Sequence, residues 1–290
     1  ATLTALRHGP QLSENPPLTN DRPPSVTEPL TPAYSRLVAQ LAPAVAAIGP
    51  VRRRLAPALS GVGDRRHVAL TFDDGPDPRS TPAFLAALRE RRVRATFFLL
   101  GESVARWPAL ARELVDAGHE VGVHGWDHRC LARRGPRATR AELARAREVI
   151  ADRTGSLPRW YRPTYGVATL TALREARRLG LTPVLWTHWG RDWTGHASAE
   201  SVFHLASRDL AGGATVLLHD CPAGQAAPDA WRATLGALPR LLDHCARRGL
   251  RVGPLGEHGI ATPRVGPSGE QDSAGTRAGP LGEVPEWPTR

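Results

Sequence analysis

The sequence predicts an α/β fold, a distorted (β/α) barrel with about seven parallel strands. Short apolar runs alternate along the chain with longer segments of helical periodicity, and strict alternation of this kind favours a parallel sheet or barrel. Seven strand candidates fall between residues 67 and 252, which favours one barrel over two stacked domains. Polar clusters follow five of these strands, and barrels collect their catalytic groups at the carboxyl ends of the strands.

Local signals mark several ends of the predicted helices. Thr81 followed by Pro82 suits an N-cap and a first helical position. Gly118, Gly180 and Gly249 each stand where a helix C-cap belongs. The expected strands are 67–72, 95–100, 120–123, 160–162, 182–186, 214–218 and 250–252. The expected helices lie near 81–91, 103–117, 138–153, 168–179, 198–211 and 230–248.

The composition is that of a soluble globular protein, with 41% hydrophobic and 23% charged residues among 290. No apolar run approaches the roughly 18 residues that cross a bilayer, so we expect no transmembrane segment. All 38 basic residues are arginine, which indicates codon bias and weakens any functional interpretation of the +10 net charge. The arginine clusters at 52–54 and 89–94 lack interleaved aromatic residues, so we expect no nucleic-acid partner.

Three segments differ in composition. Residues 1–63 form a Pro-rich arm that we expect to be disordered, with a short amphipathic linker helix within 34–60. One folded domain is expected over 64–260, and a disordered Gly/Pro-rich tail over 261–290. Cys130, Cys221 and Cys245 lack CxxC spacing, so three reduced thiols and one disulfide with a free thiol both remain open.

The first polar cluster is an acidic pair. Neighbouring side chains in a strand point to opposite faces, so Asp73 and Asp74 can face one pocket only because Gly75 and Pro76 end the strand. Two carboxylates that close repel each other unless a cation or an arginine compensates. Taken alone, an Asp-Asp-Gly run is more often a structural turn, because Asp and Gly both favour turns.

A histidine pair stands after the third strand. His124 and His128 have i, i+4 spacing, which places both imidazoles on one side of a helical turn. A lone pair of this kind is more often a surface or capping feature. With Asp74 it makes a two-His, one-Asp set with open positions, which favours a divalent metal. His119 has no such partner and is expected to be structural.

The five clusters together carry a family resemblance. Residues 71–76 (TFDDGP) resemble the first motif of the polysaccharide deacetylase family, also called the NodB-homology or carbohydrate esterase family 4 domain. Residues 118–124 leading to His128 are similar to its second motif. Residues 162–166, 192–193 and 216–220 resemble the other three, in the same order. The resemblance covers residues 64–256 and implies a distorted barrel that removes acetyl groups from sugars with the help of a metal.

The resemblance also implies residue roles on the metal side. Asp74, His124 and His128 would hold a divalent ion, either zinc or another transition ion such as cobalt. Asp73 would be the general base that activates the attacking water, and Arg162 would pair with Asp73. A metal suits this chemistry because it lowers the pKa of water from about 15.7 to about 7.

The remaining implied roles concern the acyl group and the leaving group. The main-chain N–H of Tyr165 would help the metal to hold the oxyanion. His219 would be the general acid that protonates the leaving amine, with Asp192 tuning it. Trp193 and Leu217 would form the apolar slot for the acetyl methyl group.

Three positions depart from the family pattern. Gly125 stands where a Ser or Thr often braces the metal loop, and Thr164 replaces a second proline. Trp189, three residues before Asp192, stands where the family usually has an acid. We expect Trp189 either to stack on a sugar ring or simply to pack. No departure removes a metal ligand, base or acid.

The sequence therefore predicts a metal-dependent N-deacetylase acting on N-acetylglucosamine in peptidoglycan or chitin-like glycans. An O-acetyl (xylan-type) esterase uses the same machinery, and a non-catalytic carbohydrate-binding relative is the third hypothesis. A small acetylated metabolite stays open as a substrate. We expect a monomer located outside the cell or in the cell envelope, with the cytoplasm as the alternative.

Overall fold

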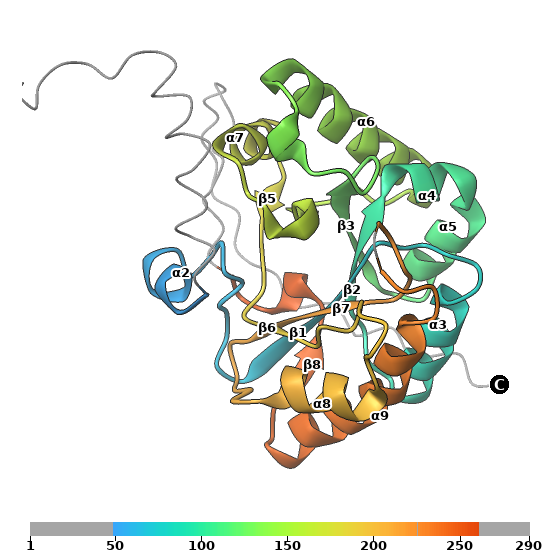
Figure 1. The fold of residues 1–290 in the computed structure, drawn as a ribbon, viewed down its shortest axis with the longest axis vertical. Coiled ribbons are helices and arrows are strands. Elements are labelled where there is room, and N and C mark those ends of the chain that lie inside the picture. The colour runs from blue at the N-terminus through green and yellow to red at the C-terminus, as the bar shows by residue number, and fades with distance from the viewer. Residues whose placement is uncertain (1–48, 225, 261–290) are drawn as a thin grey trace, which may run out of the picture. The chain divides into compact units, whose positions relative to one another are not determined.

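A curled sheet of eight parallel strands forms the centre of the computed structural model, which describes residues 49–224 and 226–260 (Figure 1). The order is β5-β4-β3-β2-β1-β7-β6, with β8 paired to β1. The edge strands β5 and β6 are not joined in this order, so the barrel is open there. The strands are β1 (His67–Asp73), β2 (Thr96–Leu100), β3 (Glu120–Gly125), β4 (Trp160–Tyr161), β5 (Thr182–Pro183), β6 (His188–Trp189), β7 (Thr215–His219) and β8 (Arg251–Gly253).

This sheet confirms the predicted fold class. Each of the seven expected strands is present, and β6 is an additional two-residue strand that pairs with β7. The expected helix near 103–117 is instead two helices, because Pro108 has no N–H to donate and begins a new helix. The helices surround the curled sheet (Figure 1). They are α2 (Gly49–Leu55), α3 (Thr81–Glu90), α4 (Gly101–Arg106), α5 (Pro108–Asp116), α6 (Pro136–Thr154), α7 (Leu170–Arg178), α8 (Ala199–Ser207) and α9 (Trp231–Arg247).

Strand β1 separates the apolar core from the functional face of the sheet. All seven of its residues are buried. Phe72 packs between Phe84 of α3 and Phe97 of β2, with ring centroids 5.2 and 5.0 Å away. Because side chains alternate along a strand, Thr71 and Asp73 point to the other face of the sheet. Alternate residues of β1 therefore pack in the apolar core, while Thr71 and Asp73 between them point to the functional face of the sheet.

Residues that precede the first strand also contact the sheet. Arg52 of α2 donates a hydrogen bond to the carbonyl of Trp186 (2.7 Å), and the N–H of Leu185 donates to the carbonyl of Leu59 (2.7 Å). Helix α2 is the described part of the predicted linker helix. Residues 56–60, which the linker helix was also expected to include, form a turn instead, so that part of the prediction is wrong. Residues 1–48 and the tail lie outside the described residues. In the described chain no helix is long and apolar enough to span a membrane.

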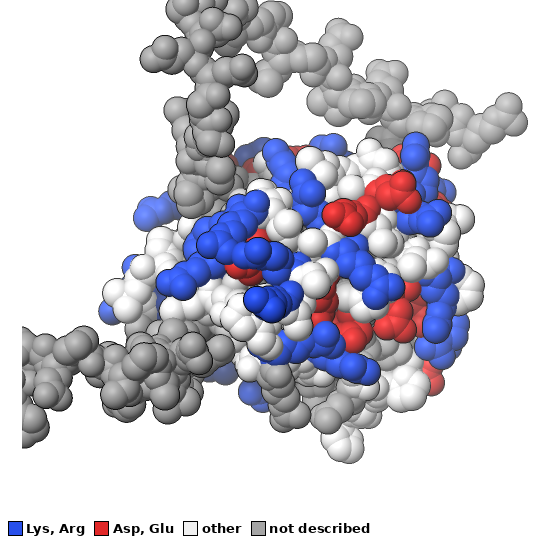
Figure 2. All heavy atoms as spheres, turned by 90° about the horizontal axis from the view of Figure 1, so that it is seen from above, with Lys and Arg blue, Asp and Glu red and all other residues white. Residues whose placement is uncertain are grey.

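Charges of both signs are interspersed on the surface. Figure 2 shows arginine side chains spread over one face with acidic side chains between them. Arg134 pairs with Asp127 (3.2 Å) and Glu142 (2.8 Å), and Arg140 pairs with Glu175 (2.7 Å). The three cysteines are free, so of the two states left open by the sequence the structure has three thiols.

Candidate active site

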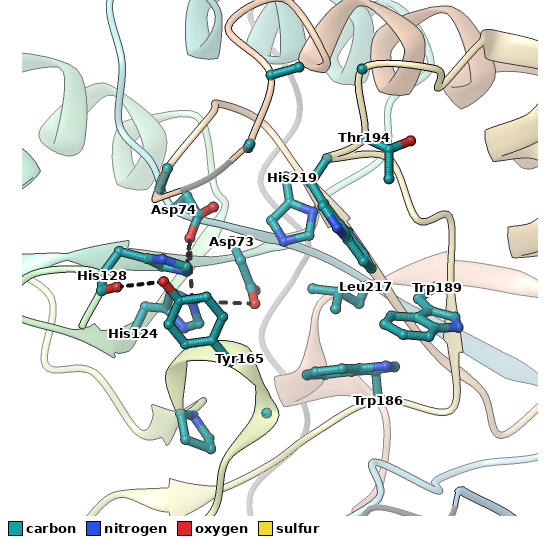
Figure 3. Close-up of a pocket in the computed structure, with 17 residues that line it drawn as sticks. Asp73, Asp74, His124, His128, Tyr165, Trp186, Trp189, Thr194, Leu217 and His219 are labelled. Carbon is teal, nitrogen blue, oxygen red and sulfur yellow. Dashed lines mark hydrogen bonds and ion pairs between the residues drawn. The ribbon is translucent and has the colours of Figure 1, made fainter. Parts of the chain in front are cut away.

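A cavity of about 550 Å³ opens at the carboxyl ends of the strands. Eight of the ten predicted site residues line it, while Arg162 and Asp192 lie buried behind them and contact them. The pairing of β1 with β7 sets Asp73 beside His219, so the predicted base and acid end neighbouring strands. The lining residues among those predicted are Asp73, Asp74, His124, His128, Tyr165, Trp193, Leu217 and His219 (Figure 3).

Asp74, His124 and His128 form a cluster that suits a metal ion. One potential ligand atom from each lies within 4.8 Å of the others. The Nε2 atoms of His124 and His128 lie 3.4 and 3.3 Å from Asp74 Oδ1. His124 Nδ1 donates to the carbonyl of Arg162 (2.8 Å), which leaves the Nε2 lone pair facing the cluster. Asp74 Oδ1 is buried without a hydrogen-bond partner, and a cation would satisfy it.

The two histidines do not share a helical turn, so that part of the prediction is wrong. His124 belongs to β3, and the chain bends through residues 126–128 to bring His128 back. Gly125 has a φ of +121°, a conformation that side-chain-bearing residues rarely adopt. Glycine at this position therefore permits the bend. The pairing of Arg134 with Asp127 and Glu142 braces the same loop.

Arg162 orients the predicted base. Its buried guanidinium donates to Asp73 Oδ1 (2.7 Å), to Thr71 Oγ1 (2.8 Å) and to the carbonyl of Leu185 (3.0 Å). Burial lowers the pKa of Arg162, although Asp73 opposes that shift, and arginine remains charged at neutral pH. The second oxygen of Asp73 lies 3.8 Å from His124 Nε2. Asp73 is thus fixed by one oxygen and has the other beside the metal cluster.

His219 stands across the cavity with Asp192 behind it. Its Nδ1 lies 2.8 Å from Asp192 Oδ1, and a carboxylate only accepts, so Nδ1 carries the proton and Nε2 is left for the cavity. Burial by itself lowers the pKa of His219, but the Asp192 carboxylate outweighs it and the pKa rises to about 10. At neutral pH His219 is an imidazolium with a proton to give.

Tyr165 borders the metal cluster from the loop after β4. Its φ is +59°, and its hydroxyl donates to the carbonyl of His128 (3.1 Å). Its ring meets the His128 ring edge-on at 4.5 Å. The side chain therefore helps to position the loop that carries His128, while its main chain turns sharply at the cavity.

An aromatic wall forms the other side of the cavity (Figure 3). Trp193 lies 5.7 Å from His219, Trp189 lies 5.1 Å from Trp193, and Trp186 lies 6.0 Å from Trp189, all between ring centroids. Trp189 lines the cavity, is 37% exposed and also packs against Trp186 and Trp193, so both expectations for it stand. Trp186 was not among the predicted site residues, although three tryptophans within eight residues, at 186, 189 and 193, were a usable signal.

Known proteins resemble this chain over the same region. Residues 60–184 match the family model for polysaccharide deacetylase. A chitooligosaccharide deacetylase of Bradyrhizobium is 39% identical over 203 residues, which cover 67% of this chain and 91% of that protein. A peptidoglycan-N-acetylglucosamine deacetylase of Bacillus cereus is 31% identical over 198 residues, 68% of this chain and 70% of that protein.

A solved structure agrees with these matches. The family 4 carbohydrate esterase of Streptomyces lividans, determined with acetate, has a TM-score of 0.60 and 35% identity, over 69% of this chain and 99% of that one. The fold, the cavity at the strand ends and these similarities lead to one conclusion. The chain belongs to the polysaccharide deacetylase family.

Proposed function

We propose that this protein is a metal-dependent N-deacetylase that removes acetyl groups from N-acetylglucosamine units of a glycan. The observation that carries the proposal is the pairing of two sets of groups across one cavity. Asp73 and the Asp74 cluster stand on one side, and the charged His219 stands on the other. The names of the Bradyrhizobium and Bacillus cereus relatives support this substrate class.

Asp74, His124 and His128 would hold the ion, for which zinc and cobalt are the candidates. A divalent ion bound there supplies Lewis-acid activation of water and of the acyl oxygen. Asp73 takes the proton of the attacking water on the oxygen that Arg162 leaves free. Arg162 keeps the carboxylate pointed at the cavity through the two hydrogen bonds to Asp73 and Thr71.

His219 completes the reaction at the leaving group. Its Nε2 gives a proton to the amide nitrogen as the C–N bond breaks, so the products are acetate and a free amine. General acid–base catalysis of this kind contributes about 10²–10⁴ in rate. The N–H of Tyr165 is assigned to the developing oxyanion, and one such donor is worth about 10²–10³. The methyl group lies between Trp193 and Leu217.

The experiment is acetate release from N-acetylglucosamine oligomers by metal-stripped protein and by the same protein after addition of zinc or cobalt. We expect release only with metal. Acetylated xylan in a parallel assay separates an N-deacetylase from an O-acetyl esterase. Absence of release from every N-acetylated glycan, with one ion bound per chain, would overturn the proposal. We propose the cell envelope or the outside of the cell as the protein's location, because polymeric glycans of this kind lie there.

A further inference from the structure

Trp189 presents uncovered apolar surface to the cavity. It is 37% exposed and lines the cavity together with Trp186. Single exposed apolar side chains are ordinary on an outer surface, but an indole left open inside a concave cavity is a surface for a ligand. The reaction derived above uses Trp193 and Leu217 for the methyl group and gives Trp189 no task.

This surface is continuous with the methyl slot. Trp189 is the register partner of Leu217 between β6 and β7, and its ring lies 5.1 Å from that of Trp193. Trp189 therefore adjoins both residues of the slot. Figure 3 shows Trp186, Trp189 and Leu217 together on the side of the cavity opposite the Asp74 cluster. An acyl carbonyl held at the Asp74 cluster thus has these rings on the far side of the cavity.

Trp189 is also held in place before any ligand arrives. The Arg191 guanidinium lies over its ring at 5.2 Å from the centroid. The next residue, Gly190, is packed so closely that a Cβ there would lie 2.7 Å from Val202 of α8 and 3.0 Å from Leu218 of β7. A ring fixed in this way loses little conformational freedom when a ligand binds.

We propose that the aromatic wall takes the acyl chain itself, so that the protein hydrolyses N-propionyl and N-butyryl sugars as well as N-acetyl sugars. The inference rests on the proposed function. The chemistry is unchanged: the oxygen of water bonds to the acyl carbon, the C–N bond breaks, and the amine leaves with a proton. The other product is propionate or butyrate.

The hydrophobic effect supports a longer acyl chain. Each further methylene that leaves water for an indole surface strengthens binding about four-fold. A charged side chain at position 189 would instead lose its hydrating water when an acyl chain covered it, which costs free energy. The tryptophan that stands at position 189 thus favours the acyl groups that a carboxylate there would reject.

The test is a chain-length series on the zinc-loaded full chain. We would measure kcat/KM for chitobiose carrying N-acetyl, N-propionyl or N-butyryl groups. The intact protein should cleave all three, with kcat/KM rising about four-fold for each added methylene. Trp189→Asp should lower the butyryl-to-acetyl ratio of kcat/KM by about 16-fold, which is four-fold for each of two methylenes. Trp189→Phe, which keeps an apolar ring, should preserve most of the ratio.

Trp107→Asp is the matched control. Trp107 is 42% exposed between α4 and α5 and does not line the cavity, so its substitution should leave the ratio unchanged. Hydrolysis of the acetyl substrate alone would overturn the inference and leave the proposed function standing. An equal loss on all three substrates in Trp189→Asp would place a sugar ring on the indole and also overturn it.

Failure of the intact protein on every substrate would instead overturn the proposed function, and the inference with it. Circular dichroism would show whether Trp189→Asp folds. If it does not, the series on the intact protein and on Trp189→Phe decides the question.

Discussion

Asp192 accepts two hydrogen bonds from a single residue, His219. Its Oδ1 lies 2.8 Å from the ring Nδ1, and its Oδ2 accepts the main-chain N–H at 2.7 Å. Thr234 of α9 donates to the same Oδ2 at 2.7 Å. The carboxylate is thus fixed by three donors while it is 1% exposed. This arrangement sets both the orientation and the charge of the imidazole.

Asp192→Asn should therefore move the alkaline limb of the pH–activity profile to lower pH. Burial lowers the pKa of His219 and Asp192 raises it, so removal of the negative charge lets the pKa fall from about 10. The acid form is the active one, and its fraction falls as pH rises through the pKa. Asn at 192 should reduce kcat/KM by about 10²–10⁴ near pH 9.

The measurement is kcat/KM against pH for both proteins with zinc bound. A cation beside Asp74 adds positive charge near His219, so the limb of the intact protein should itself lie below pH 10. The exposed Asp229 provides a control, since Asp229→Asn should leave the profile in place. An unmoved alkaline limb in Asp192→Asn would show that His219 is not the acid.

Much of this site could be predicted from the sequence, because apolar runs followed by polar residues show where each strand has its carboxyl end. Apolar runs marked the strand ends, so Asp73 and His219 could be assigned to one rim before their strands were known to be neighbours. The bend at Gly125 could not be predicted, because the i, i+4 spacing of His124 and His128 is also typical of a helical turn. Trp186 was missed because it stood at the end of the expected strand 182–186, where a tryptophan resembles an ordinary core residue.

Long-range packing was the other part that the sequence left open. Thr234 lies 42 residues from Asp192, and only the docking of α9 brings its hydroxyl to the carboxylate. Asp220 follows His219 in the sequence, and no role was predicted for it. In the structure it is fully buried, accepts from Thr81 at the start of α3 (2.5 Å) and lies against Gly75.

Asp74→Ala should abolish high-affinity zinc binding and, with it, the stabilisation that zinc provides. Asp74 Oδ1 stands between the Nε2 atoms of His124 and His128, so its removal deletes one of three ligands. Zinc at a hundred times its Kd should stabilise the intact protein by about 2.7 kcal/mol. Isothermal calorimetry and thermal melts with and without zinc would measure both effects.

The control for this substitution is Asp116→Ala, which removes an exposed carboxylate at the end of α5. It should bind zinc as the intact protein does. Retention of full zinc affinity by Asp74→Ala would contradict the assignment of the cluster as a metal site, whatever the activity of the variant.

Gly75→Ala should lower both stability and zinc affinity. A Cβ at position 75 would lie 2.7 and 2.8 Å from Oδ2 and Oδ1 of Asp220, and Thr81 donates a hydrogen bond to Oδ2. Because Gly75 directly follows Asp73 and Asp74, relief of that clash must displace the turn that carries them. Overpacking of this kind costs about 1–3 kcal/mol.

Urea unfolding and zinc titration would test this expectation. Gly135→Ala is the matched control, because a Cβ there would meet nothing within 4 Å and its φ is −70°. It should leave zinc affinity unchanged. If Gly75→Ala and Gly135→Ala gave the same stability and the same zinc affinity, the close packing of Asp220 against Gly75 would not be what positions Asp73 and Asp74.

Acid should destabilise the fold through His119, which binds the main chain as a neutral ring. Its Nδ1 accepts the N–H of Ala95 (3.2 Å), and burial lowers its pKa to about 4. The unfolded chain, with a pKa of about 6.5, takes up the proton first as pH falls. The stabilising contribution is therefore complete above pH 6.5 and is lost as pH falls toward 4, by at most about 3 kcal/mol.

Urea unfolding at pH 7 and pH 4.5 would measure this loss of unfolding free energy. The difference between the two pH values should be smaller for His119→Gln than for the intact protein, whereas the exposed His204→Gln should retain the full difference. Equal acid sensitivity in His119→Gln would assign the loss to other buried groups, of which His67, with its pKa also lowered to about 4 by burial, is the next to substitute.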